Sequence, residues 1–64
     1  MDKKISIILS TYNEAQVIEQ TISKIFKHVK NVEIILVDDN SSDGTFEKVK
    51  KIDNPNLKLF SRKS

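Results

Sequence analysis

The chain has 64 residues with one histidine and no cysteine, and its 11 basic and 9 acidic residues leave a formal net charge of +2. This length allows at most one domain, and such a small domain usually needs disulfides, a bound metal or a partner to be stable. The composition excludes disulfides and thiolate or multi-histidine metal sites, and the balanced charge predicts no nucleic-acid partner. No stretch approaches the roughly 18 apolar residues of a membrane span, so we expect no membrane segment and a cytoplasmic location.

The first half of the chain predicts a strand followed by an amphipathic helix. Residues 5–9 read Ile-Ser-Ile-Ile-Leu, a β-branched run that ends in polar residues. Apolar residues then recur at helical spacing, which predicts a helix from about residue 14 to about residue 29. Two overlapping capping boxes, 11–14 and 13–16, predict its beginning, and Asn31 predicts a left-handed residue after its end.

The second half predicts another strand, helix and strand. Residues 33–37 end in four consecutive apolar residues, which is typical of a central parallel strand covered on both faces. A helix from about 43 to 52 and a strand over 57–60 follow. This alternation predicts an α/β fold, a three-stranded parallel β-α-β-α-β unit with right-handed crossovers.

The predicted topology leaves one face of the sheet without cover. If the strands are added in one direction, both crossover helices lie on the same face. The apolar run Ile34–Val37 should not tolerate an uncovered face in a monomer. Met1 has the character of a genuine start, whereas no predicted strand or helix comes to an end at Ser64. We therefore expect residues 1–64 to be a partial, truncated domain.

Two polar segments follow the first two strands and lead into helices. These are residues 10–14 and 37–45. Ligands of open α/β sheets bind beyond the carboxyl ends of the strands, where carboxylates can accept hydrogen bonds from base N–H groups or ribose hydroxyls. Tyr12 alone could be a packing residue, and Asp38-Asp39 alone could form a cap and turn. Their occurrence at one sheet edge favours a ligand site.

Three other kinds of site fit the residues poorly. A dinucleotide site needs a glycine-rich first turn, but the single glycine, Gly44, is in the second loop. A calcium-binding EF-hand loop starting at Asp39 would have Lys50 where it needs a glutamate. A phosphate-accepting receiver domain needs an aspartate at the end of a later strand, and the only later strand ends in Phe60-Ser61-Arg62.

The sequence Ser-Thr-Tyr-Asn-Glu (10–14) followed by Val-Asp-Asp-Asn-Ser-Ser-Asp-Gly-Thr (37–45) resembles the N-terminal signature of family 2 glycosyltransferases. It is most similar to polyprenyl-phosphate sugar transferases of the dolichol-phosphate mannosyltransferase type. The resemblance implies the N-terminal part of a Rossmann-like GT-A nucleotide-binding domain, whose two loops hold the base and ribose of a UDP- or GDP-linked sugar. Asp38 would orient the second loop, and Ser10 stands where the family usually has proline. The residues implied to line the nucleotide pocket are Ser10, Tyr12, Glu14, Val37 and Asp39.

The same resemblance implies functional groups that this sequence does not contain. The family's metal-binding Asp-x-Asp, catalytic base and acceptor site lie further along the chain. We therefore expect no catalytic residue, metal site or cofactor in this segment, and Mg²⁺ or Mn²⁺ in the full-length family. The expected function is the nucleotide-sugar-binding segment of a glycosyltransferase, inactive alone, whose full-length reaction transfers a sugar from a nucleotide diphosphate donor to a lipid phosphate or glycan acceptor.

Two alternatives from other classes remain open. One is a non-enzymatic βαβ association module that self-associates through the uncovered sheet face. The other is a residual gene fragment without function.

Overall fold

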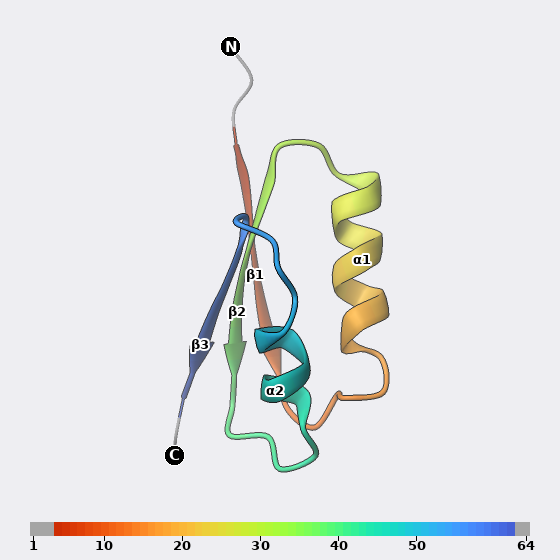
Figure 1. Cartoon of the computed structure of the whole chain (residues 1–64). Coiled ribbons are helices and arrows are strands. Elements are labelled where there is room, and N and C mark those ends of the chain that lie inside the picture. The colour runs from red at the N-terminus through yellow and green to blue at the C-terminus, as the bar shows by residue number, and fades with distance from the viewer. Residues whose placement is uncertain (1–3, 63–64) are drawn as a thin grey trace.

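A computed structural model describes residues 4–62 of the chain. The three strands form one parallel sheet in the order β1-β2-β3, and Figure 1 shows both helices on the same face of it. The predicted α/β fold, with three parallel strands and both helices on one face, is therefore confirmed. The elements in chain order are β1 (Ile5–Thr11), α1 (Ile18–His28), β2 (Val32–Asp38), α2 (Thr45–Lys50) and β3 (Leu57–Ser61).

The core lies between the sheet and the two helices, with β2 at its centre. Ile34 and Leu36 of β2 are fully buried, with Ile7 and Leu9 of the neighbouring strand opposite them in register. Full burial of one such side chain is worth roughly 1.5–3 kcal/mol. The buried cluster consists of Ile18, Ile22, Val32, Ile34, Leu36 and Val49. These few residues fix the helices against the strands and so set the position of the loops at the carboxyl edge.

The opposite side of the sheet carries no helix, and we call it the uncovered face. Alternation along the strands puts on it the apolar residues Ile8, Ile35, Val37 and Phe60. Ile8 is 70% exposed and Phe60 is 55% exposed, whereas Ile35 and Val37 are half-buried between neighbouring strands. The apolar run of β2 thus divides evenly between the core and a surface open to solvent.

The predicted beginning of α1 is wrong, and the reason is a tertiary contact. The helix begins at Ile18, with Val17 as an N-cap residue that makes no side-chain hydrogen bond. Thr11, the first residue of one predicted capping box, instead belongs to β1. The N–H groups of Glu14 and Ala15 donate to side chains of the second loop. The hydrogen bonds that a local cap would make are therefore supplied from about 30 residues away along the chain.

Other boundaries differ from the prediction by a few residues. The strands extend to Thr11 and Asp38 because these two residues continue the ladder of β1 and β2. The second helix is shorter than predicted, since it follows Gly44 in the left-handed region at φ +93°. Asn31 has φ +55°, which confirms the predicted left-handed residue after α1.

Both helices are short. The longer one, α1, has 11 residues. Over residues 4–62, none of the helices combines the length and the apolar character needed to cross a membrane.

Candidate functional site

The carboxyl ends of β1 and β2 meet at a buried carboxylate. Asp38 is 1% exposed and accepts a hydrogen bond from the Thr11 hydroxyl at 3.0 Å. It also accepts hydrogen bonds from the backbone N–H of Ser41, at 3.0 Å, and from the Ser41 hydroxyl. A buried charge is tolerated only when such donors surround it. Asp38 thus ties the second loop to both strands, which is consistent with the loop-orienting role that the resemblance implied.

The first and second loops are also joined directly through Asn13. Its backbone N–H donates to the Ser41 hydroxyl at 2.8 Å, and its side-chain Oδ1 accepts from the N–H of Ser42 at 2.9 Å. Asn13 makes both bonds from the left-handed region, at φ +52°. Asparagine tolerates this conformation better than most residues. The sequence around Asn13 therefore shapes the backbone of the first loop for contact with the second.

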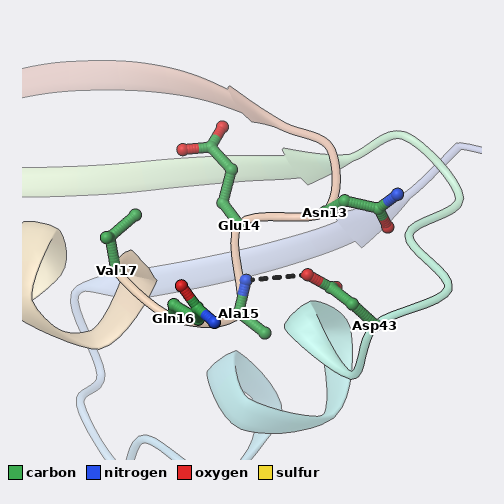
Figure 2. Close-up of a pocket in the computed structure, with 6 residues that line it drawn as sticks. All are labelled: Asn13, Glu14, Ala15, Gln16, Val17 and Asp43. Atoms are coloured by element: carbon green, nitrogen blue, oxygen red, sulfur yellow. Dashed lines mark hydrogen bonds between the residues drawn. The ribbon is translucent and has the colours of Figure 1, made fainter.

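Two further bonds fix the segment that leads into α1. The Glu14 N–H donates to the Thr45 hydroxyl at 2.9 Å, and the Ala15 N–H donates to Asp43 Oδ2 at 3.0 Å. Figure 2 shows the second of these bonds, with the Glu14 side chain projecting away from Asp43. Asp43 also accepts from the N–H and hydroxyl of Thr45. The hydrogen bond from the Thr45 hydroxyl, reinforced by the backbone donors, lowers the pKa of Asp43 from its ordinary value of 3.8.

Four of the five residues predicted to line the nucleotide pocket lie at or directly after the carboxyl ends of the adjacent strands β1 and β2. Ser10 and Val37 are register partners near the ends of β1 and β2. Tyr12, 61% exposed, follows β1 directly. Asp39 follows β2, and its N–H donates to the Thr11 carbonyl at 2.8 Å. The fold thus brings these four residues together, as expected from parallel strands; that they contact a nucleotide stays a prediction.

The fifth residue, Glu14, lines a pocket of about 480 Å³. This pocket lies between the connection from β1 to α1 and Asp43 (Figure 2). It does not include Ser10, Tyr12, Val37 or Asp39. The residues that line it are Asn13, Glu14, Ala15, Gln16, Val17 and Asp43.

The third strand adds a residue that the sequence did not indicate as part of the site. The Arg62 N–H donates to the Asp38 carbonyl at 2.8 Å, and its Nε lies 3.4 Å from Oδ1 of Asp39. Reasoning from motifs missed it because it follows a short strand and belongs to no recognisable pattern. The strand order could have found it, since all three carboxyl ends of a parallel sheet lie at one edge.

The acidic residues at this edge do not gather into a metal site. Within residues 4–62 no group of three or more histidine, cysteine, aspartate or glutamate side chains is arranged to hold a metal ion. The expectation of Mg²⁺ or Mn²⁺ in the full-length family stays a prediction.

Comparison with known proteins places this sequence among glycosyltransferases. Over 51 residues the chain is 41% identical to a dolichol-phosphate mannosyltransferase of Pyrococcus furiosus, covering 77% of the chain and 14% of that protein. Over 52 residues it is 42% identical to an uncharacterised glycosyltransferase of Mycoplasma genitalium, covering 77% and 18%. Over 58 residues it is 41% identical to a poly-β-1,6-N-acetyl-D-glucosamine synthase of Staphylococcus aureus, covering 88% and 14%.

The matched region spans less than a fifth of the length of each of these relatives. The model of one protein family, described as glycosyl transferase family 2, matches residues 6–64, nearly the whole chain. This is the family that the paired motifs at residues 10–14 and 37–45 indicated. The chain belongs to glycosyl transferase family 2.

Proposed function

We propose that this chain binds the nucleotide of a nucleotide-sugar donor at the carboxyl ends of β1 and β2. The observation that carries the proposal is the different environment of the two adjacent aspartates, Asp38 and Asp39. The carboxylate of Asp38 is buried and fully engaged by Thr11 and Ser41. The side chain of Asp39, the next residue along the chain, is 41% exposed and is accessible to a ligand. One carboxylate holds the loop while the next is available for binding.

The proposed contacts follow from the chemistry of the exposed groups. Asp39 is an acceptor for a base N–H or a ribose hydroxyl, and Tyr12 offers an aromatic face on which a base can stack. Ser10 and Val37 line the surface of the sheet beneath them. Glu14 lies further along the first loop and is proposed to reach the same ligand from the other side of Tyr12. Membership of the glycosyltransferase family supports a nucleotide-sugar as the ligand.

The reaction is proposed at the level of the whole protein family. A sugar would leave its nucleoside diphosphate and form a new bond to an oxygen of a lipid phosphate or glycan acceptor. The two named relatives, a dolichol-phosphate mannosyltransferase and a poly-β-1,6-N-acetyl-D-glucosamine synthase, support both acceptor classes. This sequence contains no Asp-x-Asp, so we propose that the 64-residue chain transfers no sugar by itself, even with Mg²⁺ or Mn²⁺.

Nucleotide titration followed by amide NMR tests the binding proposal. UDP or GDP at millimolar concentration should shift the amides of residues 10–14 and 37–40, and Asp39→Asn should weaken binding because an amide replaces the acceptor carboxylate. Asp53→Asn is the matched control, since Asp53 is an exposed carboxylate in the connection after α2, outside both loops. Absence of shifts at either loop, or equal losses in the two variants, would overturn the proposal.

A second candidate function is association through the uncovered face. The exposure of Ile8 and Phe60 favours it, because each exposed side chain of this size forgoes roughly 1.5–3 kcal/mol of burial. We propose that the isolated 64-residue chain self-associates by bringing two such faces together. Sedimentation of the chain over a range of concentrations tests this, and a monomer at high concentration would exclude it.

A further inference from the structure

The first strand of the sheet has a free outer edge. Over residues 4–62 the strand order is β1-β2-β3, so β1 pairs on one side only. The Ile5 N–H donates to the Asn31 carbonyl, and the Thr11 carbonyl accepts from the Asp39 N–H. Both ends of β1 thus turn the backbone groups of odd-numbered residues toward β2. Because successive residues of a strand turn these groups to opposite sides, the residues that present them outward are Ser6, Ile8 and Ser10.

The two edges of the sheet differ in how well they are protected. Open strand edges can pair with another chain, and short length, charged side chains and proline are the usual protection. The third strand, β3, has five residues, carries Lys58 and begins soon after Pro55. By contrast, β1 has seven residues and contains neither a charged residue nor a proline. Its middle residue, Ile8, is 70% exposed. The outer edge of β1 is therefore the one that is open to a further strand.

We propose that the outer edge of β1 pairs in antiparallel orientation with the same edge of a second copy of this chain, forming one continuous sheet. A second copy is the occupant because the outward groups match their own kind. A register centred on Ile8 sets Ile8 opposite Ile8 of the second copy, and Ser6 opposite Ser10 of the second copy. This register pairs the whole of Ile5–Thr11. Residues opposed in this way exchange two hydrogen bonds, so every outward N–H and carbonyl of the strand gains a partner.

The side chains of β1 fit the same register. The two Ile8 side chains meet on the uncovered face, where each is largely exposed in the single chain. On the face that carries the helices, Ile7 lies opposite Leu9 of the second copy, which continues the row of apolar side chains packed against the core. Such cross-strand apolar pairs stabilise antiparallel strands, and β1 contains no like charges to oppose them. This contact is distinct from the pairing of two uncovered faces, because it uses the backbone of β1 and does not involve Phe60.

Sedimentation of Ser6→Pro and Ser6→Ala tests the edge contact. Proline removes the outward N–H of residue 6 but none of the bonds between β1 and β2, and strands tolerate proline at such edge positions. Ser6→Ala is the matched control, because it also loses the hydrogen bond from the Ser6 hydroxyl to Glu33 but keeps the N–H. The association constant of Ser6→Pro should be lower than that of Ser6→Ala by about tenfold or more, since each copy loses a bond across the edge. Equal association of the two folded variants, or a wild-type chain that stays monomeric at high concentration, would overturn the inference.

Amide hydrogen exchange on the wild-type chain tests the same contact without a substitution that could unfold it. The amides of Ser6, Ile8 and Ser10 should exchange more slowly as the protein concentration rises. Phe60→Thr should preserve this protection, because Phe60 acts through the uncovered face alone. Exchange of these amides that does not depend on concentration would overturn the inference, and association abolished by Phe60→Thr would overturn it in favour of the uncovered face. Nucleotide titration tests the proposed nucleotide site separately.

Discussion

Thr11 and Asp38 are register partners at the carboxyl ends of β1 and β2, and the Thr11 hydroxyl donates to Oδ1 of Asp38 at 3.0 Å. Both residues are buried, at 4% and 1% exposure. Among the described residues, no buried side-chain nitrogen or oxygen lacks a hydrogen-bond partner. The junction of the two strands is therefore a polar contact within the core. Its loss should lower the free energy of unfolding and change the conformation of the loops.

Replacing Thr11 by valine tests this junction. Thr11→Val keeps the size and β-branching of the side chain but removes the hydroxyl, so Asp38 keeps only the donors from Ser41. We expect the free energy of unfolding to fall by about 1–3 kcal/mol, the range for a buried charged group that loses a partner. Urea denaturation measures it. Thr21→Val is the control, because the Thr21 hydroxyl bonds the Val17 carbonyl near the surface of α1. Equal effects of the two substitutions would contradict the prediction.

The neighbouring aspartates should respond differently to the same substitution. Asp38→Asn places an NH₂ group or a neutral oxygen among donors that need an anionic acceptor, and should destabilise the fold by about 1–3 kcal/mol. Asp39→Asn changes an exposed group and should alter stability by less than about 0.5 kcal/mol while weakening nucleotide binding. Denaturation and nucleotide titration of both variants measure the two effects. A large loss of stability in Asp39→Asn would show that its carboxylate is structural.

Acid should loosen the contact between the second loop and the start of α1. The pKa of Asp43 is lower in the folded chain than its ordinary value of 3.8, chiefly because of the Thr45 hydroxyl. The ionised carboxylate therefore stabilises the fold above pH 3.8, and this contribution is lost as the pH falls through the lowered pKa. Asp43→Asn should reduce the acid dependence in this window. Circular dichroism melts from neutral to acidic pH measure it, and identical pH profiles for the wild type and the variant would refute the assignment.

Self-association should depend on the uncovered face. Ile8→Thr and Phe60→Thr keep residues that favour strands while removing apolar surface, so each should lower the apparent association constant in sedimentation experiments. Val17→Thr is a matched control, since Val17 is also exposed but precedes α1. A loss of association as large in Val17→Thr as in Ile8→Thr would mean that the contact lies elsewhere.

The sheet and its helices could be predicted from the sequence because their patterns are local. The apolar run at Ile34–Val37 indicated a central strand, and its neighbours on both sides confirm this. The start of α1 could not be predicted, because the groups that bond Glu14 and Ala15 are Thr45 and Asp43, far away in the sequence.

Some residues of the candidate site could likewise be predicted from local sequence motifs, whereas others depend on contacts between distant parts of the chain. The motifs around Tyr12 and Asp39 predicted that these residues follow adjacent parallel strands at one sheet edge, which the fold confirms, whereas nucleotide binding there stays a prediction. The position of Arg62 depends on strand order, which no local pattern encodes. Its backbone bond to Asp38 forms only when β3 lies beside β2. Residues whose position depends on strand pairing, such as Arg62, are therefore the ones that local sequence motifs do not reveal.

The hydrogen bonds between the two loops also bear on the order of folding. The bonds from residues 13–15 to residues 41–45 join positions 28 to 31 apart in the chain. Such contacts form only after the intervening chain has been closed into a loop, which makes them late events in folding. A short peptide copying either loop would therefore lack the site. During synthesis the site cannot assemble before Thr45 has emerged from the ribosome, so the first loop is made long before it acquires its shape.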